Sequence, residues 1–320
     1  MKNLSRLALA LVLSALSLQA LPQSWPQRPV KFILPLGPGS GADITGRLLA
    51  DRLSKRWGQP VVVENRPGGD GVIAINAVIS ARDDHTLLYG PSSSFVGHPY
   101  SLDKMPYDPR ELQPVARVSS TVVVIAVPAS LNVASLKDLM AMVRAEPGKL
   151  NWASITNVTD IVIEGFLKGA GLNAVKIAYK NPVAGLTDLT EGRLHFYSSA
   201  YAIVRGQAQA GRIKVLAVQN RGRVPGLDLP TVAEAGFPGL NFDGLVGILA
   251  ARSSGVPDAV RERIAADVKA ELSDPVIVER MTATGQIVSP GTPAELAASI
   301  DEQAGHLAEL AKALGFKPKQ

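Results

Sequence analysis

The sequence predicts an α/β fold with two lobes and a cleft between them. Short apolar runs alternate with helical segments almost throughout the chain, which is typical of α/β layers. A glycine-rich loop joins the first apolar run to the first helix, and ligands of open α/β sheets bind at such strand ends. Two strand-like runs, Thr121–Val127 and Phe242–Ala250, bracket a middle block that could be an inserted lobe.

The first strand, loop and helix lie within Val30–Arg47. Val30–Leu34 is apolar and suits a buried strand. The segment Gly37–Gly41 contains three glycines, so its backbone can approach a ligand closely. Loop N–H groups and a helix N-terminus together favour an anion. We therefore expect this loop to bind a ligand carboxylate through backbone N–H groups, while Asp43 caps the helix and points away from the ligand.

The remaining elements follow from the same alternation, which predicts largely parallel sheets. A helical face is expected between the second and third strands, and another helix at Ser135–Ala145, where a serine precedes the first apolar residue. The other expected strands are Val61–Glu64, Thr86–Tyr89, Ala174–Tyr179, Leu194–Tyr197 and Lys214–Gln219. The C-terminal part is expected to be mostly helical, at Pro257–Leu272, Pro275–Thr284 and Pro293–Leu314.

Composition and the N-terminus predict an exported protein. In Met1–Ala20, Lys2 and Arg6 precede an apolar run that is too short to span a bilayer, which is typical of a signal peptide. Removal of these two cations lowers the net charge from +5 to +3. The chain has no cysteine, so it has no disulfide and no thiol nucleophile. Without a basic stripe interleaved with aromatic residues, we expect no nucleic-acid partner. We expect a periplasmic monomer without cofactor or metal.

Four small, polar clusters each follow a strand-like run: Gly37–Gly41, Pro91–Ser94, Ser154–Thr159 and Ser198–Ala200. Hydroxyl and backbone N–H groups at strand ends are neutral donors that suit a carboxylate. Any single cluster could simply cap a helix. Four clusters in similar positions favour a binding cleft.

An NAD(P)-dependent oxidoreductase is the alternative that the glycine loop suggests. Gly37-x-Gly39-x-x-Ala42 fits the dinucleotide fingerprint, and Glu64 follows at about the right distance. Pro38, however, stiffens this turn, and no catalytic group lies near it in the sequence. A secreted hydrolase is less favoured, because no G-x-S-x-G motif is present. The histidines, His85, His98, His195 and His306, show no metal-site spacing and are interpreted as structural or surface residues.

Several motifs, in this order, resemble the periplasmic solute receptors of the tripartite tricarboxylate transporters, also called Bug receptors. They extend over nearly the whole chain after Ala20, and the most characteristic is VVVENRPGGDG at Val61–Gly71. The others are Trp25–Pro29, Pro35–Asp43, Met105–Pro109, Pro147–Asn151, Tyr179-Lys180, Leu189–Gly192 and Leu229–Gly236.

The resemblance implies a two-lobed receptor of the periplasmic-binding-protein type II (Venus flytrap) class. Such a receptor holds an organic carboxylate between its lobes and delivers it to inner-membrane transporter subunits. The expected lobes are residues 21–120 with 247–320, and residues 121–246. The ligand-binding residues that the resemblance and the polar clusters imply are Leu36, Gly37, Pro38, Gly39, Ser40, Gly41, Asp43, Ser92, Ser93, Ser94, Ser154, Thr156, Asn157, Val158, Thr159, Ser198, Ser199 and Ala200.

The sequence departs from the family pattern in the second lobe, and this departure predicts the ligand class. Ser199-Ala200 stands where many members have an Asp-Asn pair, so this position has no carboxylate to hold a ligand ammonium. Val158 and Ile161 are expected to pack against an apolar part of the ligand. Only Arg205 lies near enough in sequence to meet additional ligand charges. We therefore expect a carboxylate without an amino group, partly apolar, and weak binding of citrate-like ligands.

Overall fold

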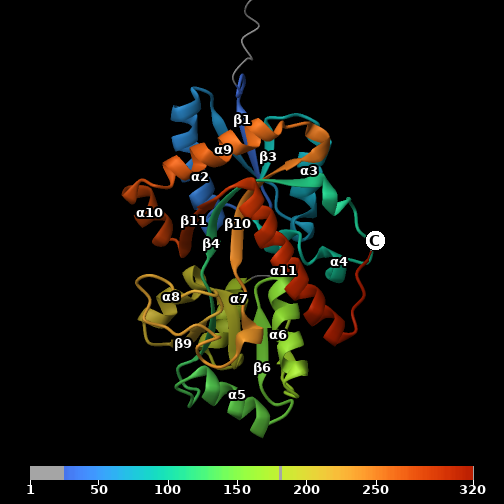
Figure 1. The fold of residues 1–320 in the computed structure, drawn as a ribbon. Coiled ribbons are helices and arrows are strands. Elements are labelled where there is room, and N and C mark those ends of the chain that lie inside the picture. The colour runs from blue at the N-terminus through green and yellow to red at the C-terminus, as the bar shows by residue number, and fades with distance from the viewer. Residues whose placement is uncertain (1–24, 180–181, 320) are drawn as a thin grey trace, which may run out of the picture.

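Two β-sheets form the cores of two lobes in the computed structural model, which describes residues 25–179 and 182–319 (Figure 1). The first lobe contains the six-stranded sheet, in the order β11-β4-β10-β3-β1-β2. The second lobe contains the five-stranded sheet, in the order β7-β6-β8-β5-β9. The predicted signal segment Met1–Ala20 lies outside the described residues.

The first sheet consists of β1 (Val30–Leu34), β2 (Val61–Asn65), β3 (Thr86–Pro91), β4 (Leu112–Thr121), β10 (Gly244–Ala251) and β11 (Gln286–Gly291). The second consists of β5 (Val123–Pro128), β6 (Asn151–Ser154), β7 (Val175–Lys176), β8 (Phe196–Ala200) and β9 (Ile213–Val218). The helices are α2 (Gly41–Trp57), α3 (Val72–Ala81), α4 (His98–Ser101), α5 (Leu136–Ala145), α6 (Asn157–Gly169), α7 (Pro182–Thr190), α8 (Tyr201–Gln209), α9 (Asp258–Glu271), α10 (Pro275–Thr282) and α11 (Pro293–Leu314).

Both sheets are mixed, so the prediction of largely parallel sheets is wrong. β1 runs parallel to β2 and β3, and β6 runs parallel to β7 and β8, as βα units require. In contrast, β10 is antiparallel to β3 and β4, and β5 is antiparallel to β8 and β9. The antiparallel pairs involve the strands next to the two crossings between the lobes. Local sequence does not encode whether such a strand runs parallel or antiparallel to its neighbours.

The first crossing between the lobes divides the run that was predicted as one strand, Thr121–Val127. β4 ends at Thr121 in the first sheet, and β5 begins at Val123 in the second. Between them, the Val122 N–H donates to Gly285 O at 2.9 Å, and Val122 O accepts from the Tyr201 N–H at 2.8 Å. The return crossing leads from the end of β9 to the start of β10. Residues 122 and 242–244 therefore join the lobes.

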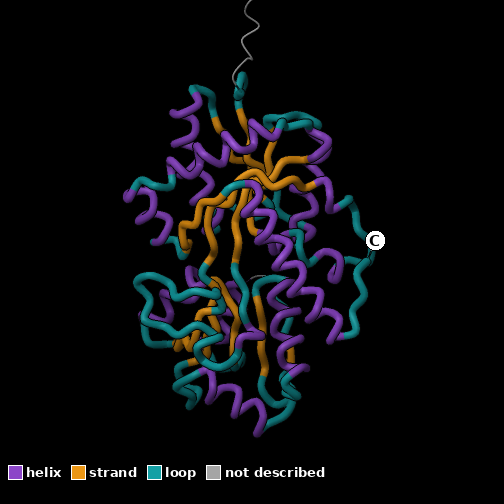
Figure 2. The backbone as a smooth tube through the Cα atoms, viewed as in Figure 1, coloured by secondary structure: helices purple, strands orange, loops and turns teal. Residues whose placement is uncertain are grey.

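Helices cover both faces of the first sheet, as Figure 2 shows. Side chains of a strand alternate between the two faces. In β1, Phe32 packs with Leu49 and Leu53 of α2, whereas Ile33 packs with Ile75 of α3 on the opposite face. Because both faces of β1 are covered by helices, nearly every residue of Val30–Leu34 is apolar. The packing of Phe32 against Leu49 and Leu53 also holds α2 against one face of the sheet after the glycine loop.

The long helix α11 belongs in sequence to the first lobe but also packs against the second. Leu307 and Ala311 share an apolar cluster with Val158 and Val162 of α6 and with Val123 of β5. In addition, Cβ of Leu310 lies only 2.9 Å from where a side chain at Gly165 would begin. The helices α6 and α11 therefore touch closely. None of the helices within residues 25–179 and 182–319 is long and apolar enough to cross a membrane.

Candidate functional site

A cavity of about 430 Å³ lies between the lobes, and we call it the cleft pocket. It lies where the loops after β1 and β3 face the loops after β6 and β8, as the strand-end rule for α/β sheets predicts. Its lining is mostly apolar. The lining residues are Pro35, Leu36, Gly39, Ser40, Gly41, Ala42, Gly68, Asp70, Gly71, Pro91, Ser93, Ser94, Thr121, Val123, Ile155, Thr156, Thr159, Ala200, Ala202, Ile203, Phe242, Gly244, Thr284 and Gln286.

The glycine loop enters this pocket through Leu36 and the segment from Gly39 to Gly41, but not through Gly37 or Pro38. Gly39 has φ +83°, a left-handed conformation that favours glycine. At the start of α2, the N–H groups of Gly41 and Ala42 have no acceptor among the described residues, because the helix supplies none. These two N–H groups, with the positive end of the helix dipole, make this part of the pocket wall electrostatically favourable for an anion.

Asp43 does not cap α2, contrary to the prediction. Ser40 is the cap, and its Oγ accepts from the Asp43 N–H at 3.2 Å. The Asp43 carboxylate is buried and accepts from the Gly39 N–H at 2.9 Å, from Arg47 and from Asn65. Burial alone would raise the pKa of Asp43, but these hydrogen bonds outweigh it and hold the pKa below its usual value. Asp43 thus holds the glycine loop in place through Gly39, on the side away from the pocket, and does not line the pocket.

The serine turn Ser92–Ser94 divides between two surroundings. Ser93 and Ser94 line the cleft pocket, and within the described residues neither hydroxyl has a hydrogen-bond partner. Ser92 points elsewhere, since its Oγ donates to Gln303 Oε1 of α11 at 2.5 Å. Two of the three predicted serines are therefore available to a ligand.

The second-lobe loop before α6 contributes fewer free groups than predicted. Thr156 and Thr159 line the pocket, but they form the capping box of α6 and bond to each other at 3.0 Å. Ser154 donates to Asp160 at 2.7 Å and does not line the pocket. Val158 faces away, because its side chain occupies the space next to Gly97. Ile161 does not line the pocket either, and the isoleucines in its wall are Ile155 and Ile203.

Ser198 and Ser199 are not in the pocket, because β8 continues through Ala200 instead of ending at Tyr197. Both serines are buried, and Ser198 Oγ donates to Gln219 Oε1 at 2.5 Å. Only Ala200 of this cluster lines the pocket. After it, the first turn of α8 presents the backbone N–H groups of Ala202 and Ile203, for which the helix has no acceptor.

Asp70 lines the cleft pocket and was not among the predicted site residues, although it belongs to the motif Val61–Gly71. Its Oδ2 accepts from Asn157 Nδ2 at 2.9 Å, a hydrogen bond that joins the two lobes. The fully buried His98 donates its Nε2–H to Asp70 O at 2.9 Å, and the same nitrogen lies 3.9 Å from the Asp70 carboxylate. Burial raises the pKa of Asp70, and His98 and Asn157 only partly offset this effect.

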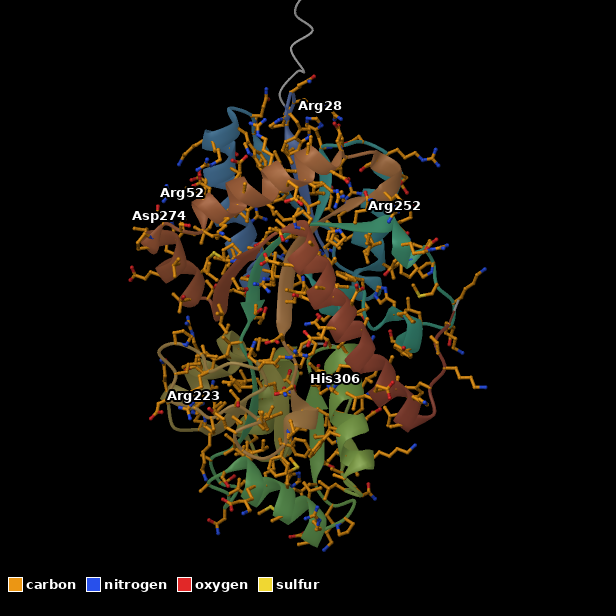
Figure 3. All side chains as sticks on the ribbon, viewed as in Figure 1. Arg28, Arg52, Arg223, Arg252, Asp274 and His306 are labelled. Carbon is orange, nitrogen blue, oxygen red and sulfur yellow. The ribbon has the colours of Figure 1, made fainter. Side chains whose placement is uncertain are left out.

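No lysine or arginine of the described chain lines the cleft pocket, and Asp70 is its one charged residue there. Arg205, which the sequence suggested as a residue that could meet additional ligand charges, donates to Ala283 O and does not line the pocket. Figure 3 places Arg28, Arg52 and Arg252 on the outside of the first lobe and Arg223 on the second. The neutral donors available to an anion in this pocket are backbone N–H groups, hydroxyls and the side-chain amide of Gln286.

One cluster outside the cleft, formed by Asp83, Asp84 and His85, contains residue types that can bind a metal ion. Its atoms are already engaged. His85 Nδ1 bonds to Asp84 at 2.6 Å, His85 Nε2 accepts from the Gln27 N–H, and Arg28 pairs with Asp84 at 3.2 Å. These contacts anchor the start of the described chain to the first lobe. Similarly, the carboxylate of Glu64 is paired with Arg66 at 2.7 Å.

Comparison with known proteins identifies relatives of the whole chain. The family model described as "tripartite tricarboxylate transporter family receptor" matches residues 45–316. A UPF0065 protein of Bordetella bronchiseptica is 32% identical over 98% of this chain and 93% of its own length. Protein BugT of Bordetella pertussis is 28% identical, with 92% of each chain covered.

Solved structures agree with this result. R. palustris Rpa4515 with adipate superposes with a TM-score of 0.79 at 28% identity, over 92% of this chain and 100% of that one. The periplasmic binding protein BugD superposes with a TM-score of 0.74 at 26% identity, over the same shares.

Proposed function

The chain belongs to the tripartite tricarboxylate transporter receptors, the Bug family of periplasmic solute-binding proteins, and from this premise we propose that it captures a small organic carboxylate in the cleft pocket. It would then present the closed, loaded form to the inner-membrane subunits of a transporter of the same tripartite type. The family and fold are those of receptors, so they do not favour the oxidoreductase that the fingerprint at Gly37–Ala42 suggested.

One observation carries this proposal: the first turns of two helices, one from each lobe, both line a pocket without basic side chains. Gly41 and Ala42 of α2 belong to the first lobe, and Ala202 and Ile203 of α8 belong to the second. A carboxylate at either terminus would gain N–H donors and a favourable dipole without a lysine or arginine. A ligand that touches both termini would hold the lobes together.

The ligand class that fits best is an aliphatic carboxylate without an amino group. Ile155, Ile203 and Phe242 provide apolar walls between the two helix termini. A similar protein, R. palustris Rpa4515, was solved with adipate, whose two carboxylates are separated by an aliphatic chain. A third carboxylate, as in citrate, would lie in the same small cavity as Asp70, and like charges repel there.

Closure is proposed to be a hinge motion at residue 122 and residues 242–244, where the chain crosses between the lobes. The predicted division into residues 21–120 with 247–320 and residues 121–246 would then describe the two moving bodies except at its boundaries, because Thr121 and Gly244–Val246 belong to strands of the first sheet. In the present structure, the Asn157–Asp70 hydrogen bond already joins the lobes across the cleft.

Calorimetry on the purified protein tests the proposal with adipate, hexanoate, glutamate, citrate and NAD. We expect adipate or hexanoate to bind at micromolar dissociation constants and to raise the melting temperature, because a ligand of the native state stabilises it by mass action. Ser94→Ala should weaken binding roughly 10- to 150-fold, as expected for loss of about 1.5–3 kcal/mol from a hydrogen bond to a charged group. The matched control Ser101→Ala changes an exposed serine outside the pocket and should leave affinity unchanged.

Two results would contradict the proposal. Binding of NAD with no response to any carboxylate would favour the dinucleotide alternative. Tight binding of glutamate or citrate, with no response to hexanoate or adipate, would leave a carboxylate receptor but refute the proposed ligand class.

A further inference from the structure

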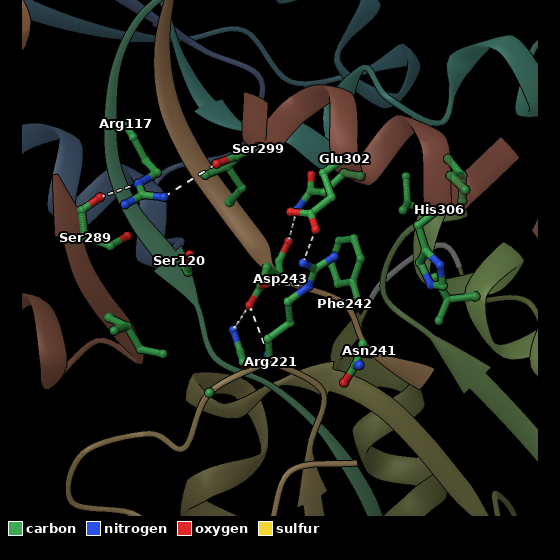
Figure 4. A pocket seen from close by; sticks show the side chains of 18 of the residues that line it. Arg117, Ser120, Arg221, Asn241, Phe242, Asp243, Ser289, Ser299, Glu302 and His306 are labelled. Carbon is green, nitrogen blue, oxygen red and sulfur yellow. Dashed lines mark hydrogen bonds and ion pairs between the residues drawn. The ribbon is translucent and has the colours of Figure 1, made fainter. Parts of the chain in front are cut away.

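A second cavity, of about 340 Å³, lies at the crossing between the lobes, and we call it the hinge pocket (Figure 4). The hinge pocket and the cleft pocket lie on opposite sides of the end of β4 and the start of β10. Ser120 and Leu245 line the hinge pocket, whereas their neighbours Thr121 and Gly244 line the cleft pocket. Such alternation places successive residues of a strand on opposite faces. Phe242 lines both cavities and separates them.

The hinge pocket is lined by buried polar atoms without partners. Among the described residues, four buried side-chain atoms lack a hydrogen bond, and three of them belong to hinge-pocket residues: Asn241 Oδ1, Ser289 Oγ and His306 Nε2. Buried polar atoms are nearly always satisfied in native structures, by protein, water or ligand. Their concentration around one cavity leaves hydrogen-bonding capacity that a bound water or a polar ligand would satisfy.

Arg117 adds a positive charge to this pocket, and the nearby Glu295 carboxylate offsets that charge only from a distance, without a direct ion pair. Its Nε donates to Ser289 O at 2.9 Å, and Nη1 lies 3.5 Å from Ser299 Oγ, but it forms no ion pair within residues 25–179 and 182–319. Glu295 is bonded to Thr292 in the capping box of α11, and these hydrogen bonds, together with the charge of Arg117, hold the pKa of Glu295 below its usual value. A guanidinium offers five N–H donors in a planar fork, so most donors of Arg117 remain available at the end of the pocket formed by β4 and β11.

The two other arginines that line this pocket, Arg221 and Arg223, are both paired with carboxylates, and Arg223 bonds to Glu234 at 2.8 Å. Arg221 pairs with Glu302 and lies 3.7 Å from Asp243, so its charge is already compensated (Figure 4). These two carboxylates also make the pocket unfavourable for an ion with several negative charges. Apolar side chains complete the wall: Val158, Val162, Phe242, Leu245, Ile287 and Leu307.

From these contacts we propose that the hinge pocket is a second binding site, which takes a small organic monocarboxylate with an apolar body. Arg117 binds the carboxylate, the Ser289 hydroxyl donates to it, and the apolar wall contacts the rest of the molecule. The site is distinct from the cleft pocket, because the two are lined by different charged groups and share only Phe242.

The experiment uses 4-fluorobenzoate as a probe and fluorine NMR line broadening as the measurement. Ala202→Trp serves as the background, because Ala202 is exposed, lines the cleft and can be enlarged to fill it without disturbing a core. In this background we expect the probe still to bind. Adding Arg117→Gln should weaken binding at least 10-fold, whereas the matched control Arg252→Gln, which removes the same charge from the outside of the first lobe, should not change it.

A second variant keeps the test valid if Arg117→Gln fails to fold. Ser289→Ala removes a hydroxyl that has no partner, so it should not lower the melting temperature of the empty protein, but it should weaken probe binding several-fold. Inorganic phosphate should not displace the probe. The proposal is overturned if Ala202→Trp does not bind the probe, if the Arg117 and Ser289 variants bind it unchanged, or if phosphate competes equally well.

Discussion

Replacing Asp70 by asparagine tests both the ligand class and the role of the one charged residue of the cleft pocket. Asp70→Asn removes a negative charge but keeps a side-chain oxygen that can accept from Asn157 Nδ2. The hydrogen bond between the lobes should therefore persist. If the ligand is an anion without an amino group, the only electrostatic effect of the change is to remove repulsion, and the affinity should rise.

The size of the cleft pocket limits the magnitude. A cavity of about 430 Å³ is about 9 Å across if it is taken as a sphere, so a bound carboxylate lies at most about that far from Asp70. At about 7 Å, two unit charges repel by roughly 0.6 kcal/mol in water and roughly 2.4 kcal/mol at an effective dielectric of about 20. We therefore expect adipate to bind roughly 3- to 60-fold more tightly to Asp70→Asn.

Calorimetry at about pH 7.5 measures this change, with Asp103→Asn as a control that removes an equal charge from an exposed site outside the pocket. Weaker adipate binding to Asp70→Asn would refute the reasoning, since it would show that the carboxylate contacts the ligand favourably. Loss of glutamate binding in the same variant would show that Asp70 holds an ammonium and that the ligand is an amino acid.

The same variant has a predicted pH dependence. Burial raises the pKa of Asp70, so the folded protein binds this proton more tightly than the unfolded chain does. Asp70 therefore destabilises the native state increasingly as the pH rises from its unfolded value, near 3.8, through its folded value. The gain in melting temperature from Asp70→Asn should be larger at about pH 7.5 than at about pH 4. An equal gain at both would contradict the assigned burial.

Three further changes address the surroundings of the cleft. Gly39→Val and Gly58→Val both force a side chain into left-handed backbone, at φ +83° and +64°, and each should cost about 1–2 kcal/mol of stability, but only Gly39→Val should abolish adipate binding. Asp43→Asn should lower stability by about 1–3 kcal/mol near neutral pH. Because the pKa of Asp43 is lowered, this difference should vanish as the pH falls through its folded value, which urea unfolding at several pH values would show. Gly165→Val should cost about 1–3 kcal/mol through its clash with Leu310, and an unchanged midpoint would show that α6 and α11 can separate freely.

Local signals predicted the elements that local interactions determine. The apolar run Val30–Leu34 is β1, and the helix predicted from the cap at Ser135 is α5, with Ser135 Oγ accepting from the Asp138 N–H. The three C-terminal helices also begin at or next to the prolines that predicted them. Proline and capping residues act within one turn of the chain, so sequence alone is sufficient to place them.

Interactions between distant residues were not predictable in this way. β11 (Gln286–Gly291) pairs with β4, about 170 positions earlier, and was hidden in a region that was expected to be helical. Strand pairing of this kind leaves no periodic signal when a strand is short and half-buried.

The same limitation applies to the site. The serine clusters predicted hydroxyls free for a ligand, but Ser198 donates to Gln219 and Ser92 to Gln303, both remote in sequence. Asp70 could have been identified only from its unusual place between two glycines. A hydroxyl that bonds within the protein and one that awaits a ligand look identical in a sequence, because the difference depends on which side chain folds next to it.

The position of β10 determines the order in which this chain can fold during synthesis or export. β10 lies between β3 and β4, although about 120 residues separate β4 from it in sequence. All strands of the second lobe, from β5 to β9, leave the ribosome before it. The inserted lobe can thus form its sheet while β3 and β4 still expose unpaired edges, which are sites of aggregation. Residues 30–121 must therefore wait for the last quarter of the chain, and a truncation before residue 244 should leave a folded second lobe attached to an incomplete first one.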